Sequence, residues 1–188
     1  MSRVRSPNRA LAAVALLLGG LAPLAGGPFP SPARLDPDGP ARVRAVQLAG
    51  WLRERRAVHV VDLRDSVRFA DFHLPTARRV AEDQLEALER TRADTVVLYG
   101  DEAVVARSLR VLADGPGRVL YMVDGVGEWL VEIMNPVIAP DATAEERAAF
   151  APIAELSRYF GGLPRQGVRD SSGTSHLLEQ TRRRGCAF

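Results

Sequence analysis

Three short apolar runs rich in β-branched residues occupy the middle of the sequence, at residues 58–63, 95–99 and 118–123. Each run is too short for a helix, which is typical of a buried strand. The segments between them, residues 81–91 and 103–113, carry apolar residues at helical spacing. The side chains that this spacing directs inward are Leu85, Leu88, Val105, Leu109 and Leu112. Strands that alternate with helices predict an α/β fold in which a parallel sheet is flanked by helices on both faces.

Helical patterns also precede and follow this central region. Apolar positions from 43 to 51 are spaced for a helix that ends in charged residues. Residues 143–146, Thr-Ala-Glu-Glu, match a capping box that opens a helix to about Phe160, where two glycines end it. The remaining tail is rich in Gly, Ser, Arg and Pro, with one short helical stretch at 176–184. We expect this tail to be a surface strap or partly disordered.

The N-terminus has the layout of a secretory leader. Three arginines precede an uncharged apolar stretch at residues 10–18, and glycine and proline follow it. Together with the residues around these glycines and the proline, the apolar run reaches about 15 residues, whereas a membrane-spanning helix needs roughly 20. Pro23 and Pro28 lie where a signal-peptide cleavage site is expected and fit such a site poorly. An uncleaved anchor with membrane association through residues 10–26 therefore remains the alternative. Both alternatives export the rest of the chain, which is then periplasmic or anchored facing the periplasm.

The predicted organisation has four parts. A leader helix, either signal peptide or membrane anchor, covers residues 1–27, and a Pro-rich linker covers 28–40. The linker is expected to be extended because each proline fixes its own φ and restricts the preceding residue. The α/β domain follows at 41–136, and a helical or irregular C-terminal extension occupies 137–188.

Net charge excludes one class of function. All 25 basic residues are arginine, against 23 acidic residues and a formal net charge of +2. Arg3, Arg5 and Arg9 lie in the leader, and without them 22 basic residues face 23 acidic ones. The domain therefore lacks the clustered positive charge of nucleic-acid binders, and no nucleic-acid partner is expected.

Two motifs at the ends of the predicted strands resemble the rhodanese family. The first strand ends in Asp62-Leu63-Arg64, and His73-Leu74-Pro75-Thr76-Ala77 follows, similar to the family's Asp-x-Arg and His-Ile-Pro-Gly-Ala turn. The third strand leads into residues 124–129, similar to the family's Gly-Gly turn and closing tryptophan. The resemblance implies a rhodanese-like domain with Asp62, Arg64, His73, Pro75, Gly125 and Trp129 as its structural motif residues.

The loop after the middle strand departs from this family at its key position. In an active rhodanese this loop begins with the cysteine that carries sulfur, and its backbone amides surround that sulfur. Here the cysteine position holds Gly100, and the rest of the degenerate loop is Asp101, Glu102, Ala103, Val104 and Val105. Glycine offers no nucleophile, and two carboxylates repel an anionic sulfur donor. We therefore expect an inactive sulfurtransferase homologue, in which Asp101 or Glu102 caps the following helix.

Three further departures make the entrance of the site bulkier and more acidic. Phe72 stands where the family has glycine before the histidine. Thr76 and Asp124 replace glycines of the two turns. These changes alter the site and leave the fold in place.

The remaining candidates have structural roles as their first interpretation. Asp62 and Arg64 are expected to hold the first loop by charge-assisted hydrogen bonds, and His73 to lock its turn. Trp129, Phe69 and Trp51 are expected to be core aromatics. The three histidines are too scattered for a metal site, so we expect no metal and no cofactor.

Cys186 is the only cysteine and lies in the sequence Arg182-Arg183-Arg184-Gly185-Cys186. A lone cysteine cannot form an intramolecular disulfide, so an intermolecular disulfide remains open. The neighbouring arginines favour its thiolate.

The leading hypothesis is an exported rhodanese-like module that binds an unknown protein partner in the bacterial cell envelope. The alternative is a sulfurtransferase or thiol-redox protein in which Cys186 is delivered to the loop at Gly100. A third hypothesis is a cation site formed by Asp101, Glu102 and Asp124.

Overall fold

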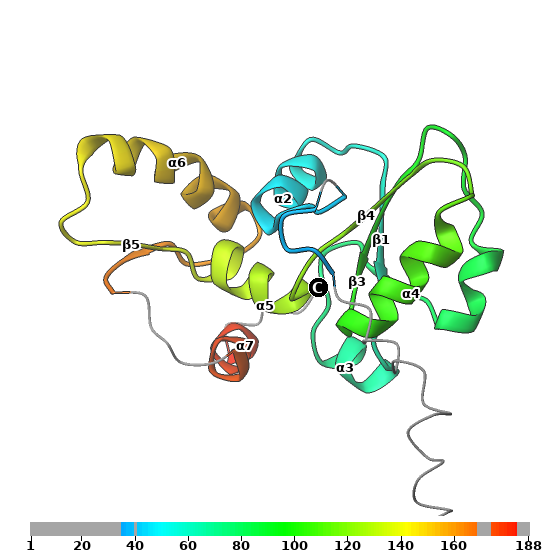
Figure 1. The fold of residues 1–188 in the computed structure, drawn as a ribbon. Coiled ribbons are helices and arrows are strands. Elements are labelled where there is room, and N and C mark those ends of the chain that lie inside the picture. Colours follow the sequence, from blue (N-terminus) through cyan, green and yellow to red (C-terminus); the bar gives the residue numbers. More distant parts are fainter. Residues whose placement is uncertain (1–34, 40, 169–173, 184–188) are drawn as a thin grey trace, which may run out of the picture. The chain divides into compact units, whose positions relative to one another are not determined.

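A four-stranded parallel sheet forms the centre of the fold (Figure 1). The structure is a computed structural model that describes residues 35–39, 41–168 and 174–183. The strand order is β2-β1-β3-β4, and the strands are β1 (Val58–Asp62), β2 (Arg78–Arg79), β3 (Thr95–Tyr99) and β4 (Arg118–Tyr121). The three predicted strands are present. The strand β2 was not predicted, because an edge strand of two exposed arginines has no apolar signal.

Helices cover both faces of the sheet, as predicted (Figure 1). Strand side chains alternate between two cores, so that Val60 and Val97 lie in one and Val61 and Val96 in the other. The first core contains residues of α2 (Ala45–Arg53), α5 (Gly125–Trp129) and its π-helical continuation η2 (Leu130–Met134). The second contains residues of α4 (Glu102–Leu112) and of the 3₁₀ helix η1 (Glu82–Ala87).

The helix predicted at residues 81–91 is shorter than expected. Only η1 forms there, and the backbone is extended at Ala81 and again at Leu88. The physical reason is that a single side chain, Leu85, is fully buried, while Leu88 is only partly buried. One buried anchor fixes a single tight turn and does not support a longer amphipathic helix.

The C-terminal extension shares the first core with the domain. Its elements are β5 (Val137–Ile138), α6 (Ala144–Tyr159), β6 (Arg165–Gln166) and α7 (Thr174–Arg183), and β5 pairs with β6 in parallel. The predicted capping box opens α6, with Thr143 and Glu146 bonded reciprocally. Leu156, Phe160 and Leu177 pack in the same core as Trp129. The described part of the tail, α7, is therefore a packed helix.

The start of the described chain lies against the sheet. Leu35 is buried in the second core, and the Tyr121 hydroxyl donates a hydrogen bond to the Asp36 carbonyl (2.5 Å). Residues 35–39 of the predicted linker thus form a packed turn, and the leader at 1–27 lies outside the described residues. Within the described ranges, none of the helices is both long and apolar enough to cross a bilayer.

Candidate functional site

The carboxyl ends of β1, β3 and β4 lead into a cavity of about 260 Å³. The segments that line it are α3 (Ser66–Asp71), the turn after β3, the start of α5 and one residue of α7. We call this cavity the mouth. Its lining residues are Arg64, Arg68, Asp71, Phe72, Tyr99, Gly100, Asp101, Asp124, Gly125, Val126, Gly127 and Leu178.

The turn after β3 has a backbone shape that glycine favours. Gly100 has a φ of +153°, and a Cβ there would lie 3.1 Å from the Leu63 Cβ. The helix α4 begins at Glu102, so Ala103, Val104 and Val105 belong to its first turns. The helix predicted at 103–113 is therefore confirmed, whereas the predicted loop is shorter than expected, because the turn closes within two residues of β3.

Neither predicted capping side chain bonds to the amides of α4. Asp101 occupies the N-cap position without a side-chain hydrogen bond to the helix. Glu102 instead accepts a hydrogen bond from the Leu35 amide (2.8 Å). The prediction that Asp101 or Glu102 caps α4 is therefore wrong. Each carboxylate instead bonds to a distant part of the chain, Asp101 to Arg68 and Glu102 to Leu35.

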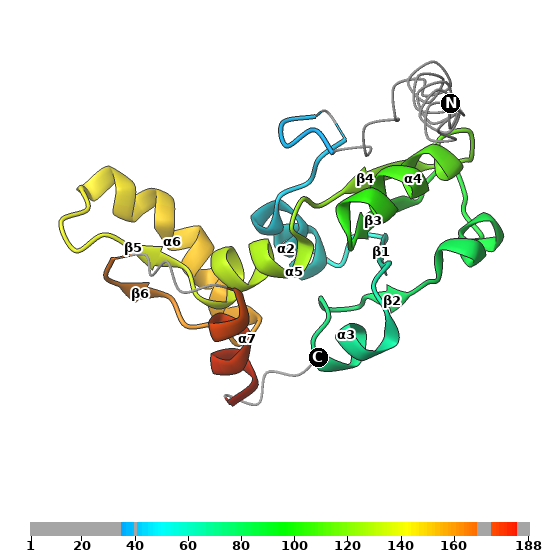
Figure 2. The same cartoon turned by 60° about the horizontal axis from the view of Figure 1, so that its bottom comes forward.

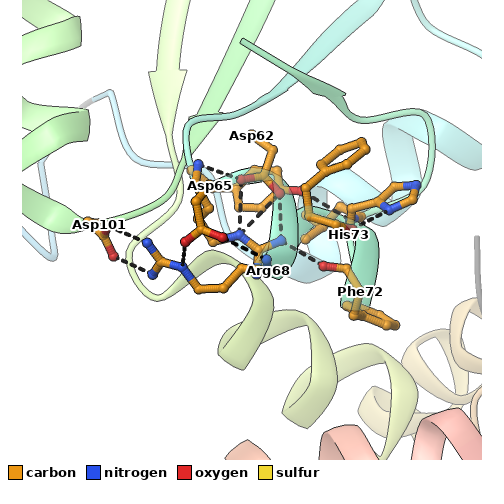
Figure 3. Close-up of polar contacts among 10 residues, drawn as sticks. Asp62, Asp65, Arg68, Phe72, His73 and Asp101 are labelled. Carbon is orange, nitrogen blue, oxygen red and sulfur yellow. Dashed lines mark hydrogen bonds and ion pairs between the residues drawn. The ribbon is translucent and has the colours of Figure 1, made fainter. Parts of the chain in front are cut away.

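Arg68 on α3 is enclosed by carboxylates (Figure 3). Its Nη1 and Nη2 donate to the two Oδ atoms of Asp101, each at 2.7 Å, and its Nε donates to Asp65 (2.5 Å). Hydrogen bonds from the Arg68 amide and side chain lower the pKa of Asp65 to about 2, and the Arg68 side chain lowers the pKa of Asp101. Both carboxylates are therefore ionised at neutral pH, and the single positive charge of Arg68 faces two negative charges.

Asp62 and Arg64 form a buried pair at the end of β1. The Asp62 side chain has no exposed surface, and that of Arg64 is 12% exposed. Arg64 Nη2 donates to Asp62 Oδ2 (2.5 Å) and to the Phe72 carbonyl (2.7 Å). The pair therefore ties the end of β1 to the end of α3, which is the structural role expected from the sequence.

The described residues that line the mouth provide no thiol to carry sulfur. Among its lining residues there is no cysteine, serine, threonine or histidine. The Tyr99 hydroxyl accepts a hydrogen bond from the Leu74 amide (3.2 Å), and burial raises the pKa of this phenol. Tyr99 therefore stays protonated at neutral pH and is a poor nucleophile.

His73 lies beside the mouth without lining it. Its ring stacks on Phe69 with centroids 4.2 Å apart, and its Nδ1 lies 3.0 Å from the Phe69 carbonyl oxygen (Figure 3 labels His73). Pro75 is buried next to it. Phe69 is only partly buried, so the prediction that it is a core aromatic is corrected: α3 has no buried residue, and Phe69 covers His73 instead.

Two of the substituted glycine positions retain glycine-like backbones. Thr76 has a φ of 63° and Asp124 a φ of 52°, both left-handed. Gly125 follows Asp124, and a Cβ there would lie 2.6 Å from the Tyr99 Cβ, so this glycine allows α5 to approach β3. Trp129 ends α5 and is fully buried.

Replacing Thr76 with glycine is expected to raise the free energy of unfolding by about 0.5–1 kcal/mol. A non-glycine residue in the left-handed conformation costs roughly 1–2 kcal/mol, and glycine removes this cost. Part of the stability gained is lost again, because glycine loses more conformational entropy on folding. Thr76 is exposed, so no buried contact is lost. Urea unfolding measures the change, with Thr76→Ala as the control that keeps the Cβ and should gain nothing. A Thr76→Gly variant less stable than wild type would contradict the strain argument.

Two hypotheses concern residues outside this arrangement. Cys186 lies outside the described residues, so its delivery to Gly100 is not tested. The cation site is contradicted, because among the described residues no cluster of three His, Cys, Asp or Glu side chains can hold a metal. Asp101 and Glu102 have other partners, as described above.

Sequence reasoning missed several residues of the mouth. Arg68 and Asp65 have an available signal, because Asp65 precedes a short helix and lies three residues before Arg68, a spacing for an N-cap and an ion pair. No sequence signal indicates that Leu178 lines the mouth or that Arg182 pairs with Asp71, because only the three-dimensional structure brings α7 to α3.

The fold and site define an α/β domain with a cavity at the carboxyl ends of the strands of a parallel sheet. The sequence model of the Rhodanese-like domain family matches residues 45–132, from α2 into η2. These residues of the chain therefore belong to the rhodanese-like domain family. No curated protein matches the chain.

Three solved structures resemble the chain at low identity. A protein from Bacillus halodurans is 17% identical over 66% of this chain and 80% of its own, with a TM-score of 0.40. A Rhodopseudomonas palustris protein of unknown function, described as a possible tyrosine phosphatase, is 17% identical over 47% and 77%, with a TM-score of 0.37. The rhodanese-like domain of an Anabaena protein is 22% identical over 50% and 74%, with a TM-score of 0.39.

Proposed function

We propose that this protein is a non-enzymatic rhodanese-like module of the bacterial cell envelope, and that its mouth binds a protein partner. The observation that carries the proposal is the turn after β3. Gly100 matches the position of the family's sulfur-carrying cysteine, and among the described residues none that lines the mouth replaces that thiol. A site without an attacking group can bind but cannot form the covalent sulfur intermediate.

The charge of the mouth supports the same proposal. Arg64 and Arg68 are its basic lining residues, and Asp71, Asp101 and Asp124 its acidic ones. Both arginines already bind carboxylates of the chain itself. An anionic sulfur donor would therefore meet uncompensated negative charge, whereas a basic group of a protein partner would be attracted.

Phosphatase chemistry, the activity suggested for the Rhodopseudomonas palustris protein, has no support in this chain. It needs a cysteine in the loop and an arginine free to hold phosphate. Gly100 excludes the first. Arg68, the nearest exposed arginine of the mouth, is bound by Asp65 and Asp101.

The cellular location follows from the leader alone. Arg3, Arg5 and Arg9 followed by the apolar stretch at 10–18 support export through a signal peptide or an uncleaved anchor. The module then acts in the periplasm, either free or held at the membrane through residues 10–26.

One observation supports the alternative function, a sulfurtransferase or thiol-redox protein that uses Cys186. Arg182 forms an ion pair with Asp71, a lining residue of the mouth, and Cys186 follows Arg182 by four positions. A thiol so near in sequence to this anchor is the best remaining nucleophile of the chain. The same attachment would also suit an intermolecular disulfide to a bound partner.

Sulfur transfer from thiosulfate to cyanide is expected to be indistinguishable from the buffer blank. Gly100→Cys is expected to be inactive too, because the φ of Gly100 strains any side chain and Asp101 remains beside it. Thiocyanate formation measures the rate for wild type, Gly100→Cys and Cys186→Ser. Wild-type turnover that disappears in Cys186→Ser would overturn the proposal in favour of the alternative.

A further inference from the structure

The helix α7 of the C-terminal extension reaches the mouth with two side chains. Leu178 lines the cavity, and Arg182 Nη2 lies 2.9 Å from the Asp71 Oδ1 at the end of α3. Figure 2 shows α7 beside the helical segment that follows α5, and η2 is the element against which it packs. The mouth of this domain is therefore already contacted by a helix of the same chain.

The spacing of these side chains defines the kind of helix that fits. Leu178 and Arg182 are four residues apart and so lie on one face of α7. Leu177 and Thr181 form the adjacent face and are buried. Arg183 is exposed and pairs with Glu179 of the same helix (2.9 Å). The mouth thus receives an apolar side chain and, one turn later, a guanidinium.

The charges of the mouth match such an occupant. Asp71 is satisfied by Arg182, whereas none of the described residues donates a hydrogen bond to the Asp124 carboxylate. Arg64 and Arg68 are bound to Asp62, Asp65 and Asp101 and do not offset these acids. A basic side chain is therefore the complementary group.

Leu177 and Thr181 anchor α7 to the core, whereas its contact with Asp71 at the mouth is the weaker part of the attachment. The ion pair of Arg182 with Asp71 is solvent-exposed, with 53% and 34% of the two side chains accessible, and such pairs are weak. A helix of ten residues is marginal on its own, so α7 depends on its docking for its helical structure. A longer helix with the same pattern would have more contact area and less ordering cost.

We propose that the partner of the mouth is an amphipathic helix that carries an apolar residue and an arginine one turn apart, and that α7 is its built-in competitor. This inference rests on the proposed binding function and adds the chemistry of the partner and the means of its regulation. Leu178 and Arg182 occupy one side of the mouth in the structure, and a partner helix would replace them there.

A labelled synthetic peptide with the sequence of residues 174–183 serves as the probe. Fluorescence anisotropy measures its affinity for the full-length wild-type, Arg182→Glu and Arg183→Glu chains. Arg182→Glu turns the attraction to Asp71 into repulsion, so this chain is expected to bind the peptide about three- to fivefold more tightly than wild type. Arg183→Glu is the matched control, because both arginines pair with Glu179 within α7 and, among the described residues, Arg182 alone of the two reaches Asp71, so this chain is expected to bind the peptide distinctly less tightly than Arg182→Glu.

A charge exchange makes the test specific to Asp71. The Asp71→Arg chain is expected to prefer a peptide carrying Arg182→Glu over the wild-type peptide, reversing the order seen with Asp71. Equal affinities of the Arg182→Glu and Arg183→Glu chains, or no reversal with Asp71→Arg, would overturn the inference. Dimerisation of Arg182→Glu that blocks the peptide would also overturn it, since the occupant would then be α7 of a second copy. Sulfur transfer by the same samples would overturn the proposed function instead, so the two failures are distinguishable.

Discussion

Replacing Arg64 with alanine is expected to lower the free energy of unfolding by about 3–5 kcal/mol, because it leaves the Asp62 carboxylate buried without its counter-charge. Asp62 has no exposed surface, and Arg64 supplies two side-chain nitrogens and a backbone amide to it. The variant also loses the bond to the Phe72 carbonyl, which joins β1 to α3. Urea or thermal unfolding measures the loss.

Two control variants separate the buried charge from a general effect of removing arginine. Arg68→Ala removes an equally bonded but exposed arginine and is expected to cost about 1 kcal/mol or less. The double variant Asp62→Leu with Arg64→Met removes both charges and is expected to recover most of the stability lost by Arg64→Ala. If Arg64→Ala costs no more than Arg68→Ala, the pair does not hold the first loop.

Replacing Trp129 with alanine is expected to cost about 3–5 kcal/mol, the usual loss for a fully buried aromatic. Trp129 is 0% exposed, and its ring meets that of Phe160 edge to face with centroids 5.1 Å apart. Because Phe160 follows α6, the variant is expected to loosen the extension together with the domain. Hydrogen exchange of residues 144–159 reports the loosening, and equilibrium unfolding reports the stability.

Trp51 provides the matched control for Trp129. It packs only partly buried on the same core, so Trp51→Ala is expected to cost distinctly less. The loss in the double variant Trp129→Ala with Phe160→Ala should be smaller than the sum of the single losses, since the two rings share one contact. Additive losses, or unchanged exchange in α6, would show that the extension is independent of the domain core.

The central fold could be predicted because its signals are local. The runs that form β1, β3 and β4 are buried on both faces, so they appear as continuous apolar stretches between helical patterns. The edge strand β2 and the short helix η1 lack such signals, because pairing geometry and a single buried leucine determine them.

The candidate site was predictable only in part. The pairing of Asp62 with Arg64 depends on residues adjacent in sequence. The assignment of Gly100 to the cysteine position of the family stays a prediction. The pairs of Arg68 with Asp101 and of Arg182 with Asp71 join residues far apart in the chain, and sequence spacing does not reveal them. The position of Leu178 at the mouth could not be predicted either, because the sequence of the tail does not indicate where α7 packs.

The absence of a sulfur-carrying group in the mouth is the central claim, and intact mass spectrometry tests it most directly. The purified protein is incubated with thiosulfate, and its mass is compared with that of untreated protein and of Cys186→Ser. We predict no gain of a sulfur atom in any of the samples. A mass gain of one sulfur atom in the wild type, mapped to Cys186 and missing in Cys186→Ser, would contradict this account.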